Sequence, residues 1–397
     1  MNDRNKNPHP TRLHGLDTLR AFAVMAVLLF HYQHGWSHPA WMDNTVIGLG
    51  WTGVDLFFVL SGYLIASQLM KELETTRRIS LSHFYLKRSF RILPPFLCVL
   101  AVYVFLPEAR ETESLAPVIK YLTFTQNLGL DVAHHKTFSH AWSLCVEEQF
   151  YLVVPLLLGW ACLRRSSYRV PIAIGILVVL GILLRERITV AILQETTDAN
   201  ERLHAWKKWV YYPTYARLDG LSIGVLIAWI FQYRPRLREW LEKKHTWMFM
   251  LGVGFIVATV TIRELGFRPI VRQFFLLFAV GYGLIVVSAI SPHSWLFRLR
   301  LAPLSVLATY SYSMYLCHKI VFHLTHQTLA MTGIELNGID VMLASVAFTV
   351  FAAASMHLVI ERPSLWLRDA IFGFSGRTRL KLAFGKENPV CCDLNKW

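Results

Sequence analysis

The stretch LDTLRAFAVMAVLLFH (residues 16–31) includes Arg20 and His31, and all the residues between these two are apolar. A helix needs about 20 mainly apolar residues to cross the hydrocarbon core of a bilayer. Similar runs recur along all 397 residues, which are 54% hydrophobic and only 17% charged. Soluble domains usually carry about 25% charged residues. The sequence therefore predicts an integral membrane protein and excludes an intrinsically disordered chain.

The apolar runs predict an all-α, polytopic fold with about ten transmembrane helices. The expected spans are residues 18–34, 50–70, 89–106, 144–163, 170–184, 212–231, 246–262, 272–290, 303–325 and 339–360. A β-barrel would show alternation with a period of two, and these runs are continuous. We expect a transmembrane domain at 18–362 between cytoplasmic tails at 1–17 and 363–397.

The formal net charge of +14 indicates orientation in the membrane. In a soluble protein, such a charge would suggest a nucleic-acid partner. Here the loop at 33–50 has no Lys or Arg, whereas the next loop, at 71–91, is rich in both. Because Lys and Arg concentrate in cytoplasmic loops, this bias predicts that both termini are cytoplasmic. No nucleic-acid partner is expected.

The ionisable residues Arg20 and His31 lie in the first predicted span. Each costs at least about 2.5–3.5 kcal/mol on insertion scales, so each suggests a function. Arg20 and His31 are eleven positions apart, which places them about 20° apart around a helix and about 16 Å apart along it. One helix face would thus present a guanidinium near the cytoplasm and an imidazole deeper in the membrane. A snorkelling arginine and a hydrogen-bonded packing histidine are the structural alternatives.

A basic cluster precedes the third predicted span, in FYLKRSFRILPPF (residues 84–96). Arg88 and Arg91 are three positions apart and therefore neighbours on a helix. Together with Arg20 at the same depth, they could hold a soluble polyanion such as a nucleotide or coenzyme A, because guanidinium groups bind phosphate in a bidentate manner. Lipid phosphates are the alternative ligand, and charge alone favours them.

Further polar residues are expected toward the outer side. Glu147 and Glu148 in HAWSLCVEEQFYL (residues 140–152) are adjacent carboxylates beside aromatic rings, an arrangement that suits proton transfer. They could equally pair with Arg217. His318 lies at a depth comparable to His31, and a structural histidine is its alternative. Asp55 could orient a histidine or cap a helix. No Cys/His spacing predicts a metal site.

Taken together, these motifs resemble the membrane-bound acyltransferase-3 family, the multi-span O-acyltransferases that modify bacterial surface glycans and some secreted natural products. The resemblance covers nearly the whole chain. It is carried by Arg20 with His31, residues 53–64, Arg88 and Arg91 with Pro94, residues 142–152, residues 216–228, residues 311–318 and the terminal 361–363. The chain departs from the family at Cys145, where Ser or Ala is more usual, and in the Arg-x-x-Arg spacing.

The resemblance implies an acyltransferase of the bacterial inner membrane. It would move an acyl group from acyl-CoA to a hydroxyl of a carbohydrate or glycosylated acceptor. We expect the acyl group to be acetyl, and the acceptor could be linked to a lipid. The implied site consists of Arg20, Arg88 and Arg91 at the donor's phosphates, His31 as general base, Glu147 or Glu148 as orienting or relaying groups, and His318 as a second candidate. Direct transfer and a covalent acyl-histidine are both consistent with these residues.

Two other functions compete with this interpretation. In a transporter or flippase, the intramembrane charges would form a proton or substrate path. Such proteins often contain internal repeats, and the sequence shows none. A non-catalytic membrane sensor is the third possibility, and it should tolerate the loss of both Arg20 and His31.

Overall fold

The computed structural model describes residues 13–161, 168–265 and 274–373. Within these ranges every regular element is a helix, and the one strand-like contact is an isolated bridge between Leu115 and Thr137. The predicted all-α class is therefore confirmed for the described part of the chain.

Each expected span overlaps a helix in the described residues. These helices are α1 (His14–Gly35), α3 (Gly53–Thr76), α4 (Leu81–Phe105), α6 (Trp142–Ala161), α7 (Arg169–Glu195), α9 (Asp219–Tyr233), α11 (His245–Glu264), α13 (Phe274–Ile290), α15 (Ala302–Ala330) and α16 (Ile339–Met356). Shorter helices join them: α2 (Thr45–Gly48), α5 (Val118–Leu122), α8 (Ala199–Trp206), α10 (Pro235–Lys243), α14 (Trp295–Arg298) and α17 (Arg362–Phe372).

Among the described residues, six helical segments are long and apolar enough to cross a membrane. They are His14–Gly35, Thr45–Thr76, Leu81–Phe105, Ser139–Trp160, His245–Glu264 and Ile339–Phe372. Two shorter helices, α9 and α13, are also apolar. The structure thus supports an integral membrane protein, and the count of ten spans stays a prediction.

Several helix boundaries differ from those expected, including the start of α4, which is Leu81 rather than 89. α9 begins at Asp219 rather than at 212, because Pro213 precedes a 3-10 turn at Thr214–Ala216. α7 continues past 184 to Glu195. A π-helical turn, His357–Glu361, joins α16 to α17, so the predicted domain boundary at 362/363 falls within helix.

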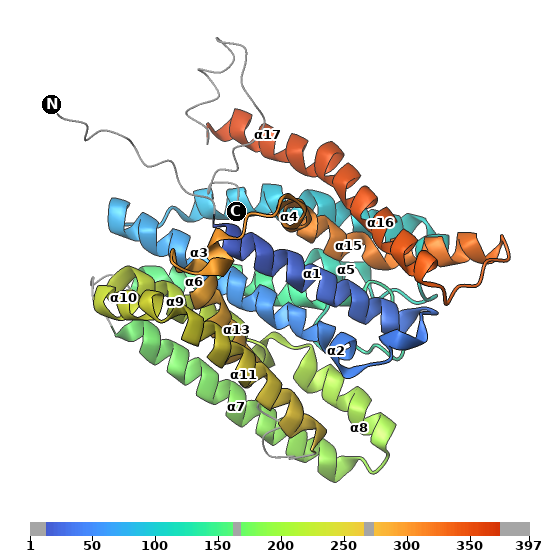
Figure 1. Ribbon diagram of the computed structural model, residues 1–397, viewed down its shortest axis with the longest axis horizontal. Coiled ribbons are helices and arrows are strands. Elements are labelled where there is room, and N and C mark those ends of the chain that lie inside the picture. The colour runs from blue at the N-terminus through green and yellow to red at the C-terminus, as the bar shows by residue number, and fades with distance from the viewer. Residues whose placement is uncertain (1–12, 162–167, 266–273, 374–397) are drawn as a thin grey trace.

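The core is a packed bundle around α1, α3 and α15. α3 packs along α9, α1 along α15, and α11 along α13. Figure 1 shows α16 and α17 at one edge and α7 and α11 at the opposite edge. α3 and α9 can approach closely because Gly62 and Gly224 have no Cβ atoms. A Cβ atom at Gly62 would overlap the Leu221 carbonyl, and one at Gly224 would overlap the Val59 carbonyl. Small residues commonly permit such contacts between membrane helices.

Two buried ion pairs hold α3, α7 and α9 together. Arg217 donates to Asp55 at 3.0 Å, and Arg185 donates to Asp219 at 2.5 Å and 3.1 Å. Arg185 also donates to the Ala216 carbonyl at 2.8 Å. Each pair neutralises charges that are almost fully buried, which explains how α7 can include Arg185. The partner of Arg217 is thus Asp55, whose contact here is structural, with no side-chain cap at the start of α3.

Candidate active site

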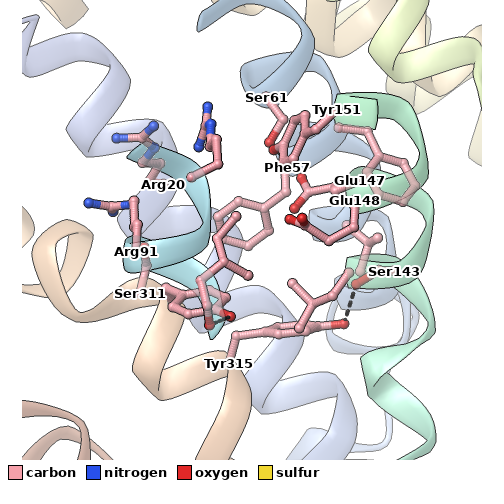
Figure 2. Close-up of a pocket in the computed structure, with 16 residues that line it drawn as sticks. Arg20, Phe57, Ser61, Arg91, Ser143, Glu147, Glu148, Tyr151, Ser311 and Tyr315 are labelled. Carbon is pink, nitrogen blue, oxygen red and sulfur yellow. Dashed lines mark hydrogen bonds between the residues drawn. The ribbon is translucent and has the colours of Figure 1, made fainter. Parts of the chain in front are cut away.

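A cavity of about 120 Å³ lies among α1, α3, α4, α6 and α15. Arg20, Arg88 and Arg91 line it together with Glu147 and Glu148, and we call it the arginine cavity. Figure 2 shows Arg20 and Arg91 on one side and both glutamates on the other. The predicted basic cluster is therefore assembled from α1 and α4, and the two carboxylates of α6 join it.

Polar and aromatic contacts arrange the arginine cavity. Ser61 Oγ donates to Glu147 at 2.5 Å. The Arg88 guanidinium lies 4.7 Å from the centre of the Tyr151 ring, within the range of a cation–π contact. Phe57 and Phe58 supply part of the apolar wall. The cavity can thus take a ligand with an anionic end and an apolar body.

Prolines within α4 shape the helix next to the arginines. Pro94 has no backbone N–H, so the Phe90 carbonyl loses its usual helical donor. Ser364 of α17 supplies a replacement, because its hydroxyl donates to that carbonyl at 2.7 Å. Tyr312 donates to the Ile92 carbonyl at 2.9 Å. Residues from α15 and α17 therefore support the stretch of backbone that carries Arg88 and Arg91.

A second cavity, of about 280 Å³, contains His31. We call it the imidazole cavity. Its lining residues are His31, His34, Gly35, Trp36, Glu111, Lys136, Lys319 and His323. Lys319 Nζ lies 3.6 Å from Glu111 Oε1, and both side chains are nearly buried. Arg20 and His31 therefore face different cavities, although both lie on α1.

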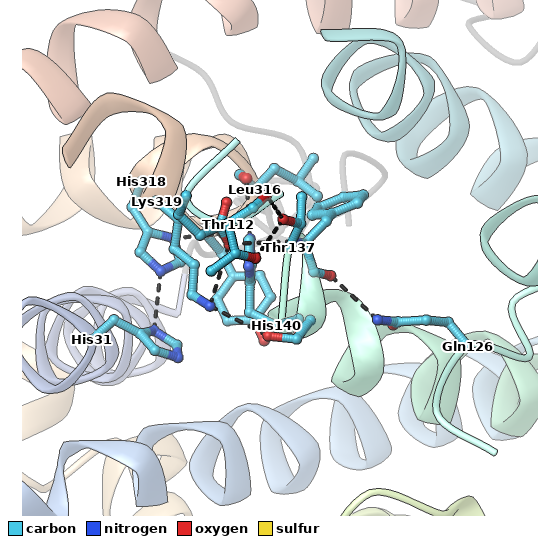
Figure 3. A network of polar contacts seen from close by, with 12 residues as sticks. His31, Thr112, Gln126, Thr137, His140, Leu316, His318 and Lys319 are labelled. Carbon is cyan, nitrogen blue, oxygen red and sulfur yellow. Dashed lines mark hydrogen bonds and ion pairs between the residues drawn. The ribbon is translucent and has the colours of Figure 1, made fainter. Parts of the chain in front are cut away.

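Three imidazoles from distant segments meet beside this cavity (Figure 3). His318 Nε2 lies 3.0 Å from His31 Nδ1. His318 Nδ1 donates to the Tyr315 carbonyl at 2.8 Å, and His140 Nε2 donates to the Leu316 carbonyl at 3.2 Å. The ring centres of His140 and His318 are 4.7 Å apart. The structure thus joins the two predicted histidines and adds His140.

Phe138 directs His140 toward α15. Its φ of 52° lies in the left-handed region, which is uncommon for a residue other than glycine. The Phe138 N–H donates to Glu111 at 3.2 Å, and its buried ring stacks on Tyr103 and Tyr121. These contacts stabilise the turn that places His140 beside His318.

A hydrogen-bonded partition lies between the two cavities. Tyr315 lines the arginine cavity, and its hydroxyl donates to the His140 carbonyl at 2.7 Å. Ser143 Oγ donates to the same tyrosine hydroxyl at 2.7 Å. Consequently, Glu147 and Glu148 lie on the arginine side of this partition, and no hydrogen bond between described residues joins either of them to His31.

Comparison with known proteins identifies the family to which this two-cavity bundle belongs. A family model described as an acyltransferase domain, of the acyltransferase-3 type, matches residues 13–358. The chain belongs to the acyltransferase-3 family. The family predicted from the motifs is thus confirmed, and with it the predicted class of enzyme at the level of the family.

Curated relatives in this family are named as O-acetyltransferases. The O-acetyltransferase OatA of Staphylococcus aureus (strain NCTC 8325 / PS 47) is 28% identical over 375 residues, which cover 89% of this chain and 57% of that protein. The peptidoglycan O-acetyltransferase OatA of Listeria monocytogenes serovar 1/2a is 28% identical over 371 residues, covering 88% and 55%. The chain therefore spans about half the length of these relatives. No solved structure matches it.

The described part of this family member shows no group of three His, Cys, Asp or Glu residues arranged to hold a metal ion. Cys98, Cys145 and Cys317 are free thiols, and the last two are buried. Cys391 and Cys392 lie outside the described residues. The candidate site, as the two cavities define it, contains arginines, glutamates and histidines, most of which the sequence analysis proposed.

Proposed function

We propose that the protein is a membrane O-acyltransferase that moves an acetyl group from acetyl-CoA to a hydroxyl of a carbohydrate or glycosylated acceptor. The observation that carries the proposal is the pair of cavities served by α1, one containing Arg20 and the other His31. Membership of the acyltransferase-3 family and the names of the relatives support the same reaction.

The arginine cavity is the proposed site for the donor. Arg20, Arg88 and Arg91 would contact the phosphates of the coenzyme, since guanidinium groups offer paired donors to phosphate oxygens. The apolar wall would receive the arm that carries the thioester. The proposal also places the protein in the bacterial inner membrane, with about ten spans and both termini in the cytoplasm. The cytoplasm is the compartment in which acyl-CoA is available.

The imidazole cavity is the proposed site for the acceptor. It combines the Trp36 ring with Glu111, Lys136 and Lys319, and such a mixture suits a sugar, which has apolar faces and many hydroxyl groups. A mature surface glycan and a lipid-linked glycan offer the same chemistry. The reacting hydroxyl would lie against His31.

The transfer itself needs one base and one leaving group. His31 takes the proton of the acceptor hydroxyl while that oxygen attacks the thioester carbonyl. The new C–O bond forms, the C–S bond breaks, and the coenzyme leaves as a thiolate. The protonated His31 then gives its proton to this thiolate, and we place Glu147 and Glu148, which line the proposed donor cavity, as groups that orient the donor. A positioned base of this kind typically contributes about 10²–10⁴-fold.

The proposed reaction requires the thioester to pass the partition between the cavities. In the structure, Tyr315 lines the arginine cavity and is held by its hydrogen bonds to Ser143 and the His140 carbonyl.

The test is His31→Ala in a deletion strain, with membrane insertion of the variant verified. Mass spectrometry of surface glycans and secreted metabolites should show an acetyl mass that the deletion removes and the wild-type gene restores. His31→Ala should fail to restore it, whereas His293→Ala, an exposed histidine outside both cavities, should succeed. Restoration by His31→Ala to the wild-type level would overturn the assignment of the base, and a deletion that removes no acetyl mass would overturn the proposed function.

A further inference from the structure

We propose that His318 is a positioning residue that fixes the tautomer of His31 and thereby keeps Nε2 of His31 available as the base. The inference rests on the proposed function and adds a specific role for the second histidine. Its basis is a chain of hydrogen bonds that runs from the Tyr315 carbonyl through His318 to His31.

The direction of each bond in this chain follows from the first one. A carbonyl oxygen can only accept, so Nδ1 of His318 must carry the hydrogen that it donates to Tyr315. A neutral imidazole has one N–H, and Nε2 of His318 is therefore an acceptor. Across the 3.0 Å contact, Nδ1 of His31 must then be the donor. This leaves Nε2 of His31 with its lone pair.

The surroundings of His318 support a positioning role. The side chain is fully buried and lines neither of the two cavities, so it does not reach the space proposed for substrates. Its ring packs against Phe322, with ring centres 5.7 Å apart. Its anchor, Tyr315, is held by the hydrogen bonds of its hydroxyl to Ser143 and His140. The chain is therefore fixed at the end away from His31.

The reverse assignment would disable His31. If His318 donated through Nε2, Nδ1 of His31 would have to accept, and the hydrogen of a neutral His31 would move to Nε2. That would either set the lone pair of His318 Nδ1 against the Tyr315 carbonyl oxygen at 2.8 Å or require a buried imidazolium, and both cost free energy. When one ring nitrogen of a histidine is held as a hydrogen-bond donor, the other nitrogen is the one that is free to react.

A matched pair of variants separates hydrogen bonding from packing. His318→Gln provides a carbonyl oxygen that can accept from His31 Nδ1, whereas His318→Met fills a similar volume without a comparable acceptor. Both are measured with radiolabelled acetyl-CoA and membranes of the deletion strain, which supply the native acceptor. We expect kcat to fall about 100-fold in His318→Met, with the KM for acetyl-CoA within about twofold, and His318→Gln to recover at least about tenfold of that loss.

Equal kcat values in the two variants, or a rise in KM that accounts for the loss, would overturn the positioning role. His31→Ala in the same assay keeps this result distinct from the proposed function. If His31→Ala is inactive and the pair are equal, only the role of His318 fails; if His31→Ala is fully active, the proposed base fails. Should His318→Met not insert, the shorter pair His318→Asn and His318→Leu makes the same comparison.

Discussion

The arginine cavity and the imidazole cavity share α1 and α15 but contain different chemistry. The first presents Arg20, Arg88 and Arg91 opposite two glutamates, and the second gathers His31 with an ion pair and a tryptophan. Guanidinium groups stay charged and suit the binding of phosphate, whereas imidazoles gain and lose protons near neutral pH. In the proposed function, donor binding and proton transfer are accordingly separate tasks, assigned to the two cavities.

Replacing the proposed base should give the largest effect, and it should change the imidazole cavity only. His31→Gln removes the proton acceptor and leaves the arginine cavity intact. We expect kcat to fall about 10²–10⁴-fold, with the KM for acetyl-CoA nearly unchanged. Initial rates over a range of acetyl-CoA concentrations measure both quantities. A rise in KM that explains the whole loss would show that the two cavities are not separate in function.

Replacing a buried ion pair should instead affect both cavities together, because it belongs to their common scaffold. Arg185→Met leaves Asp219 charged and unpaired in the core, which typically destabilises a protein by about 3–5 kcal/mol. Thermal unfolding in detergent should therefore occur at a clearly lower temperature. The double variant Arg185→Met/Asp219→Leu should recover most of this loss. No change in the single variant would contradict the structural role of the pair.

The smallest expected effect concerns the support of the arginine cavity. Ser364→Ala leaves the Phe90 carbonyl without its side-chain donor and should cost about 1 kcal/mol. Because Phe90 lies between Arg88 and Arg91, the KM for acetyl-CoA should rise a few-fold, with kcat preserved. Ser305→Ala, at the start of α15 and outside both cavities, is the control. Equal KM values in the two variants would contradict a role of Ser364 in supporting the arginine cavity.

Much of this arrangement could be predicted from local sequence patterns. Apolar runs locate the helices, and helical spacing alone places Arg88 beside Arg91 and puts Arg20 and His31 at different depths of α1. Such patterns act within a single helix, where neighbours in space are near neighbours in the chain. The depth of His318 in its own predicted span, comparable to that of His31, extended the prediction to this residue.

Contacts between distant segments could not be predicted in the same way. His140 reaches Leu316 because the strained turn at Phe138 folds the preceding loop onto α15. The position of Glu147 and Glu148 beside the arginines depends on how α6 packs against its neighbours. The late start of α9 reflects Pro213, whereas the hydrophobic run alone suggested an earlier start. Each of these features depends on tertiary packing, which hydrophobic periodicity does not encode.

The central claim is that the arginines bind the donor and His31 acts on the proton. The dissociation constant of acetyl-CoA, measured by calorimetry on the purified wild type, Arg20→Gln and His31→Gln, tests it most directly, because both variants introduce the same side chain into α1. We predict binding at least about tenfold weaker in Arg20→Gln, since a charged hydrogen bond contributes about 1.5–3 kcal/mol, and within about twofold of wild type in His31→Gln. Equal weakening in both variants, or no binding of acetyl-CoA by the wild type, would contradict the claim.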